Sequence, residues 1–280
     1  MNRSHWLDHT ILWVGILFLL TPVWLLIASS THSTQTILQE GLQFLPGSEG
    51  FAAYKTALTK ATGFTDTATG YRMLLNSTIM GLGFAIGKIL ISMMAAYALV
   101  YFRIPFAGFL FWIIFSTLLL PLEVRIVPSY DVVSQLGLLN SYTGLIVPLI
   151  ASATATFYFQ QFYKTIPNEL LEAAQLDNAG PFRFFFDILV PLSRTMIAAM
   201  FIIMFVVGWN QYLWPIMMTT EESYYTIIMG IKNILSVIRE SRVPDFNVAF
   251  ALVVLSLVPP VAVVIIFQRW FIQGLVESEK

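Results

Sequence analysis

The stretch NELLEAAQLDNAGPFRFFFDILVPL, residues 168–192, interrupts an otherwise very apolar sequence with charged and amide side chains. Thr165 and Pro167 precede it, and both are start signals for a helix, because a hydroxyl oxygen can cap free N–H groups and the fixed φ of proline suits a first turn. From residue 182 onward the stretch is aromatic and aliphatic, with Arg183 and Arg194 as cationic anchors, which is typical of a membrane boundary. The stretch therefore predicts a short helix outside the membrane, followed by a return into it.

The predicted helix has one apolar face made mostly of small residues. Leu170, Ala173 and Ala174 recur at i, i+3 and i+4. Because two of these side chains are alanines, a second backbone can approach the helix closely. Asn178 lies where the helix should end, and asparagine tolerates the left-handed conformation found at many helix ends. Gly180, which precedes a proline, stops any continuation of the helix.

The whole chain has the composition of a polytopic membrane protein. Of its 280 residues, 57% are hydrophobic and 11% are charged, with a mean hydropathy of +0.75, whereas soluble domains have about 25% charged residues. A net charge of −1 gives no support to nucleic-acid binding. The chain has no cysteine, and its histidines, His5, His9 and His32, all lie near the N-terminus. We therefore expect no catalytic residues and no metal site.

Six apolar stretches are long enough to cross a bilayer, which takes about 20 residues. The first lacks a small-residue cleavage site and is interpreted as an uncleaved span. Pro22 should bend this span, and Pro121 should break the third. Together the stretches predict an all-α fold, one membrane domain over residues 1–280, with spans at residues 11–28, 74–101, 107–128, 142–159, 195–218 and 247–268.

Lys88 lies within the second predicted span, directly after a Gly83-x-x-x-Gly87 pattern. The two glycines permit close helix packing in lipid. A nucleotide-binding loop is excluded, because the Walker A pattern needs glycine at Leu82 and serine or threonine at Ile89. A lysine in mid-span is costly and indicates function. We interpret Lys88 as a positive charge on the route of an anion or, alternatively, as a structural pair or a snorkelling side chain.

Other polar side chains lie in the outer parts of the third and fifth spans. Glu123 and Arg125 can pair with each other or line an aqueous path. Asn210 and Gln211 offer amide donors and acceptors to a polar ligand, whereas the neighbouring Trp209 can serve as an interfacial anchor or as part of a gate. The candidate residues for a translocation path or gate are thus Lys88, Glu123, Arg125, Trp209, Asn210 and Gln211.

The run Glu172-Ala173-Ala174, followed by Ile188 and Pro191, resembles the EAA motif of the membrane subunits of ABC importers. In that family the motif forms the coupling helix, which docks into a cleft of the cytoplasmic ATPase. The present sequence places asparagine where the family has glycine, and valine where it has leucine before the proline. Both replacements are mild, since asparagine tolerates a left-handed cap and valine keeps an apolar contact.

The resemblance extends beyond this motif. Residues 72–77 resemble the entry to the second span in the MalG-like class of sugar-importer permeases. The segments LPLEVRI at 120–126, ASATATF at 151–157, GWNQYLWP at 208–215 and GLVESEK at 274–280 resemble the UgpE-type permeases of sn-glycerol-3-phosphate importers. The resemblance runs from the second span to the last residue.

The resemblance implies a heterodimer with a sister permease, two copies of a cytoplasmic ATPase and a periplasmic substrate-binding protein. The chain would be a non-catalytic subunit without a cofactor of its own, and ATP and Mg would bind to the ATPase. Lys and Arg are equally numerous on both sides of the predicted spans, so their count does not orient the chain. The resemblance places the chain in a bacterial inner membrane. Because the motif must face the ATPase, it also places both termini in the cytoplasm.

The resemblance also assigns roles to single residues. The loop at residues 221–246 would meet the binding protein. The residues of the coupling helix would transmit motion, and Ile188 and Pro191 would fix the joint to the fifth span. The coupling residues implied are Glu172, Ala173, Ala174, Asn178, Gly180, Ile188 and Pro191.

Three other interpretations remain at this point. The same architecture can import a neutral sugar or oligosaccharide instead of a phosphate ester. An intramembrane enzyme is disfavoured, because no His-Glu-x-x-His or Gly-x-Ser-x-Gly motif and no carboxylate pair on one span is present. A channel or ion-coupled carrier would work without an ATPase partner.

Overall fold

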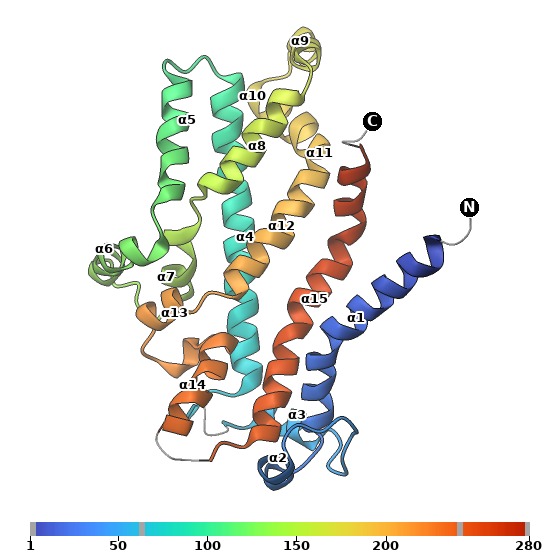
Figure 1. Cartoon of the computed structure of the whole chain (residues 1–280). Coiled ribbons are helices and arrows are strands. Elements are labelled where there is room, and N and C mark those ends of the chain that lie inside the picture. The colour runs from blue at the N-terminus through green and yellow to red at the C-terminus, as the bar shows by residue number, and fades with distance from the viewer. Residues whose placement is uncertain (1–3, 62–64, 240–242, 278–280) are drawn as a thin grey trace. The chain divides into compact units, whose positions relative to one another are not determined.

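A computed structural model describes residues 4–61, 65–239 and 243–277 of the chain. Every element of regular secondary structure in these ranges is helical (Figure 1). Within the described residues, three helices are long and apolar enough to cross a membrane, and three bent pairs of helices bring the total to as many as six. The predicted all-α membrane fold is confirmed.

The chain divides into two compact units. The first combines Met1–Asn76 with Tyr225–Val258, and the second combines Ser77–Tyr224 with Pro259–Lys280. Two long helices, α4 (Gly70–Tyr101) and α15 (Phe246–Glu277), contribute residues to both units. These two helices cover the spans predicted at residues 74–101 and 247–268.

The first unit is built on α1 (Ser4–Ser29), which covers the predicted first span. Its apolar side chains from residue 6 to residue 20 are exposed, as suits a helix surrounded by lipid or by another chain. The predicted loop at residues 29–71 contains α2 (Thr34–Glu40) and α3 (Ala52–Thr59). The Thr34 hydroxyl donates a hydrogen bond of 3.0 Å to the side-chain oxygen of Asn247, so the loop is tied to the start of α15.

Residues 221–246, predicted as a loop, contain the helix α14 (Ile227–Arg239) in the same unit. Ile227 and Met229 are buried, whereas Lys232 is exposed. Asn76 of α4 donates a hydrogen bond of 2.9 Å to the carbonyl oxygen of Tyr225, just before α14 begins. The prediction of a plain loop is therefore corrected, because isoleucines recurring along the stretch gave it an apolar face that packs on the protein.

The second unit carries the remaining spans and all the candidate site residues. Its elements, besides parts of α4 and α15, are α5 (Ala107–Ser116), α6 (Leu122–Gln135), α7 (Tyr142–Ile146), α8 (Ala153–Thr165), α9 (Asn168–Leu176), α10 (Pro181–Arg183), α11 (Val190–Leu192), α12 (Arg194–Trp209) and α13 (Leu213–Met218). A π-helical turn, Phe184–Leu189, joins α10 to α11.

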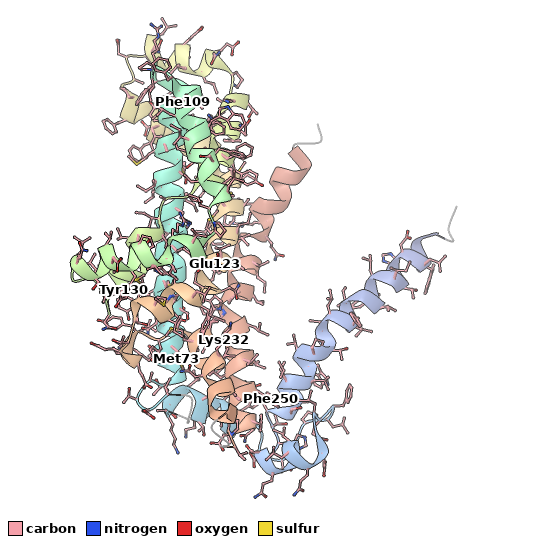
Figure 2. The ribbon with its side chains drawn as sticks, turned by 60° about the vertical axis from the view of Figure 1, so that its left-hand side comes forward. Met73, Phe109, Glu123, Tyr130, Lys232 and Phe250 are labelled. Carbon is pink, nitrogen blue, oxygen red and sulfur yellow. The ribbon has the colours of Figure 1, made fainter. Side chains whose placement is uncertain are left out.

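Three spans of this unit are bent. The chain turns by 101° between Ala107–Leu119 and Leu122–Gln135, by 49° between Tyr142–Leu149 and Ala153–Thr165, and by 75° between Pro181–Leu192 and Arg194–Trp209. The first turn lies at Pro121, as predicted, but α6 then runs across the direction of α5 and continues past residue 128 (Figure 2). Likewise α12 ends at Trp209, and Leu213–Met218 form the separate helix α13.

Glycines set the closest contacts among these helices. A methyl group on Gly208 of α12 would lie 3.0 Å from Cβ of Phe84 on α4. Further along α4, a methyl group on Gly87 would lie 2.6 Å from Cγ2 of Ile150. Gly83 faces Ile146 in the same manner. The predicted role of Gly83 and Gly87 in close packing is confirmed.

We expect Gly87→Ala to destabilise the second unit by about 1–3 kcal/mol, because the added methyl group overpacks a contact with the branched Cβ of Ile150. Gly108→Ala is the matched control, since no atom lies within 4 Å of a methyl group added there. Thermal unfolding of the detergent-solubilised protein measures both. Equal midpoints for the two variants would contradict the packing argument.

Candidate functional site

The helix α9 starts without a side-chain cap. Its N-cap residue is Pro167, and no side chain bonds to the first-turn N–H groups. The Thr165 hydroxyl instead donates a hydrogen bond of 2.7 Å to the carbonyl oxygen of Phe162. This bond lies in the last turn of the preceding helix α8. The helix was predicted at this place, but the capping role given to Thr165 is wrong, because Pro167 is the N-cap residue and no side chain accepts from the first-turn N–H groups.

The end of α9 is a Schellman turn with Asn178 in the left-handed conformation. Asn178 has φ +52°. The Ala179 N–H donates to the carbonyl of Ala174 at 2.8 Å, and the Asn178 N–H donates to that of Gln175 at 3.0 Å. These are the two hydrogen bonds that define the motif. The predicted left-handed asparagine is confirmed. Gly180, in contrast, has φ −66°, so the backbone conformation at this position does not require glycine.

The faces of α9 differ from the predicted contact face. Ala174 is buried and Leu171 is half-buried, so these two pack on the protein. Ala173 and Glu172 are exposed, and Leu176 is 84% exposed. Ala174 therefore packs on the protein while Ala173 faces outward, and the close approach of a second backbone at Ala173 stays a prediction. Ala173 belongs to an outer face that this chain leaves uncovered.

The segment after α9 is held on α4 by aromatic rings. The Tyr97 hydroxyl donates a hydrogen bond of 3.0 Å to the carbonyl oxygen of Pro181. The Tyr97 ring lies 5.2 Å from that of Phe185, and the Tyr101 ring lies 5.3 Å from that of Phe184. Both phenylalanines are buried in the π-helical turn. This joint was not predicted from the sequence, although Tyr97 and Tyr101 recur at i, i+4 on one side of α4.

Ser193 forms the 75° bend between this segment and α12. Its side chain is buried, and its hydroxyl donates a hydrogen bond of 2.6 Å to the carbonyl oxygen of Leu189. Ile188 is half-buried and Pro191 is exposed. Pro191 lines an apolar cavity of about 620 Å³ with Arg194. The bend thus lies where the resemblance expects the joint to the fifth span.

A second cavity, of about 430 Å³, lies among α4, α5, α6 and α8. Its polar lining comes from Lys88, Thr117, Arg125, Ser152, Thr154 and Thr156, and the rest of its lining is aliphatic. The sequence analysis singled out Lys88 and Arg125, which are 37 positions apart, and the structure brings both to this one cavity. We call it the cationic cavity.

The cationic cavity has two positive charges and no acidic side chain in its described lining. The Lys88 ammonium group lies 4.2 Å from the centroid of the Phe84 ring, a cation–π contact. Arg125 is exposed, and among the described residues it forms no hydrogen bond or ion pair. Because the two cations line the same cavity, like-charge repulsion acts between them.

Glu123 does not neutralise these cations. It is exposed and does not line the cavity, although it lies on α6 two residues before Arg125 (Figure 2). Side chains two residues apart on a helix point to different sides. The predicted alternative of a Glu123–Arg125 pair is therefore corrected. Within the described residues, Arg183 and Asp187 pair instead, at 3.4 Å.

The third group of candidates, residues 209–211, lies outside the cationic cavity. Trp209 is buried, and its ring stacks 5.7 Å from that of Phe205. The Asn210 amide donates a hydrogen bond of 2.9 Å to the carbonyl oxygen of Val206 and so caps α12. Gln211 is half-buried. Trp209 is thus buried by packing rather than exposed as an interfacial anchor, and the gate role of Trp209, Asn210 and Gln211 stays a prediction.

A metal centre has no support in the part of the chain that the structure describes. No group of three or more His, Cys, Asp or Glu side chains gathers there.

Comparisons with known proteins agree with this architecture. A family model described as "Binding-protein-dependent transport system inner membrane component" matches residues 88–277. The sn-glycerol-3-phosphate transport system permease protein UgpE of Agrobacterium fabrum is 46% identical over 97% of this chain and 96% of its own length. The protein of the same name from Brucella melitensis is 44% identical over 99% and 98% of the two chains.

One solved structure has the same fold along nearly the whole chain. It is a chain of a bacterial ABC transporter involved in the import of the acidic polysaccharide alginate. The TM-score is 0.79, with 20% identity, 97% of this chain covered and 99% of that chain covered.

We expect Asn178→Val to loosen the turn after α9, because a left-handed residue without a compensating side chain costs about 1–2 kcal/mol. Hydrogen exchange of the Ala179 amide, which is bonded to Ala174, should speed up roughly tenfold. Asn178→Gly is the control and should exchange within about threefold of the parent protein, because glycine adopts this conformation readily. Equally fast exchange in both variants would show that the left-handed backbone does not matter.

Proposed function

This chain belongs to the family of binding-protein-dependent transport system inner membrane components, and from that membership we propose that it is the permease subunit of an ATP-driven importer of sn-glycerol-3-phosphate. The substrate assignment rests on the 44–46% identity, over nearly the whole chain, to permeases named for sn-glycerol-3-phosphate transport. In this proposal residues 1–280 act as one membrane domain, and chemistry on ATP takes place in a separate subunit.

The proposed partners are a sister permease, two copies of a cytoplasmic ATPase and a periplasmic substrate-binding protein. The outer face of α9 supports the ATPase contact. Leu176, at the end of α9, is 84% exposed, and Phe182, in the first turn of the bent fifth span, is 79% exposed. Exposed apolar side chains beside the small Ala173 offer a partner both apolar area and close approach. ATP and Mg belong to that partner.

The same segment can pass motion to the membrane helices. A push on α9 reaches the Schellman turn, then the π-helical turn held by Tyr97 and Tyr101, and then the bend at Ser193. In this proposal Glu172, Ala173 and Asn178 receive or transmit the motion. Closure of the ATPase dimer would then bias the permease between two arrangements, facing in and facing out.

The second unit also indicates an orientation. In Figure 1, α9, the turn between α4 and α5, and the C-terminal end of α15 lie at the same end of this unit. Since α9 would face the ATPase, this end is proposed to be cytoplasmic. An even number of spans then places the N-terminus in the cytoplasm as well.

A neutral sugar fits the site less well than a phosphate ester. Two uncompensated cations in the cationic cavity favour an anion and offer a neutral sugar few fixed hydrogen-bond partners. An ion-coupled carrier is disfavoured because the relatives are subunits of transport systems that depend on a binding protein.

The test is ATP hydrolysis by the assembled complex in lipid nanodiscs. Glycerol-3-phosphate with the binding protein should raise hydrolysis several-fold above the basal rate, whereas maltose should not. A response to a neutral sugar alone would overturn the substrate, and failure of any ATPase to copurify would overturn the importer.

We expect Ala173→Trp to abolish the stimulated part of this hydrolysis, because the indole fills the space through which the partner approaches α9. Ser134→Trp is the matched control, since Ser134 is also a small exposed helical residue, on α6. Assembly is checked by copurification of all subunits. An assembled Ala173→Trp complex with full stimulation would remove α9 from the coupling route.

A further inference from the structure

The positive charges of the cationic cavity have no acidic counterpart in its described lining. Lys88 is half-buried and Arg125 lines the same cavity, while the described lining holds no carboxylate. Holding two like charges near each other within a membrane protein is costly unless an anion or water compensates them. The charges therefore stabilise a state in which an anion occupies the cavity.

The first turn of α8 adds to the positive field. Its N-cap residue Ser152 and the next two residues, Ala153 and Thr154, all line the cavity. The first N–H groups of an α-helix have no partner within the helix and carry a partial positive charge. α8 has 13 residues, so its peptide dipoles add up over several turns.

The hydroxyl groups of the cavity are not all available to a ligand. The Thr117 hydroxyl donates to the carbonyl oxygen of Ile114 at 2.7 Å, and the Thr156 hydroxyl donates to that of Ser152 at 2.8 Å. The Ser152 hydroxyl oxygen accepts from the Ala155 N–H, which leaves its proton free. Thr154 makes no side-chain hydrogen bond among the described residues. Ser152 and Thr154 can therefore donate to an anion.

From these observations we propose that the cationic cavity binds the phosphate group of the transported molecule and selects for a phosphate monoester dianion rather than for the carbon body attached to it. This inference rests on the proposed function, and it goes further by naming where and how the substrate's charge is recognised. Lys88, Arg125, Ser152 and Thr154 are the donors. The remaining lining is aliphatic, so the polyol part of the ligand finds few partners.

The proposal predicts an order of ligands. A phosphate monoester carries close to two negative charges at neutral pH, a phosphodiester carries one, and glycerol carries none. Binding to a fixed pair of cations should follow that order. Inorganic phosphate, which is also a dianion in part, should bind as well, because nothing in the cavity demands the glycerol group.

The chain has no cysteine, which makes a direct test possible. Thr154→Cys is introduced into the complex assembled with its partners, in discs of phosphatidylcholine only. The thiol is modified with an anionic or a cationic methanethiosulfonate reagent of similar size, and the modified chain is quantified by mass spectrometry. Ser134→Cys, at an exposed position outside the cavity, corrects for the intrinsic rates of the two reagents.

We expect the anionic reagent to react with the thiol of the Thr154→Cys variant at least tenfold faster than the cationic one after this correction. Glycerol-3-phosphate and inorganic phosphate should slow the reaction, a glycerophosphodiester should slow it less, and glycerol should not slow it. Lys88→Gln with Arg125→Gln should remove both the preference and the protection. Arg103→Gln, which removes an exposed cation between α4 and α5, should keep both.

The outcomes separate this proposal from the proposed function. Equal rates for the two reagents, or no protection by phosphate, in a complex that imports glycerol-3-phosphate would overturn the anion site and leave the importer standing. Charge preference and phosphate protection in a complex that imports only another substrate would overturn that substrate assignment and leave the site. Protection by phosphatidylglycerol added to the discs, with none by soluble phosphate, would assign the cavity to a lipid headgroup and overturn the proposal.

Discussion

The bends of this membrane protein depend on one constraint, which is that a backbone N–H or C=O group in lipid finds no water to pair with. At the 49° bend, the Ser152 hydroxyl caps the Ala155 N–H at 3.3 Å. The Ser152 carbonyl oxygen accepts from Ser92 of α4 at 3.2 Å and from Thr156 at 2.8 Å. At the 75° bend, the Ser193 hydroxyl instead donates to the carbonyl oxygen of Leu189 at 2.6 Å. Because side chains satisfy the opened backbone, non-helical residues can line a cavity within the membrane.

The constraint also explains which features the sequence could predict. Long apolar stretches with few charges predicted the helices, since only helices satisfy their own backbone. Gly83, Gly87 and Asn178 were predictable because the chemistry of each residue type limits it to close packing or to a left-handed turn. The motifs likewise predicted the family, which the match over residues 88–277 confirms.

Other features depend on tertiary contacts that no local pattern encodes. Pro121 predicted a break, but not a turn of 101°, because the direction after a break is set by what the next helix packs on. The pairing of Thr165 with the turn before it, and the outward position of Ala173, follow from how α8 and α9 leave the membrane. Arg125 and Lys88 could each be singled out as polar groups in apolar spans. Their meeting in one cavity without Glu123 required the fold.

The fold links α9 and the turns after it, the proposed coupling segment, to the cationic cavity through two helices. Tyr97 and Tyr101 hold the segment at the end of α4, and Lys88 lies on that helix nine residues before Tyr97, a rise of about 13 Å. Tyr101 also donates to the Tyr163 carbonyl at 3.4 Å, at the end of α8, whose first turn carries Thr154. A helix passes an axial or rotational shift along its length, because close packing makes it stiff. In the proposed importer, a movement of α9 acts on the two helices that carry binding groups of the proposed anion site, so the separation of those groups changes with the state of the partner ATPase. Under that proposal, binding of the anion and closure of the ATPase are coupled in both directions, since linkage between two sites is reciprocal.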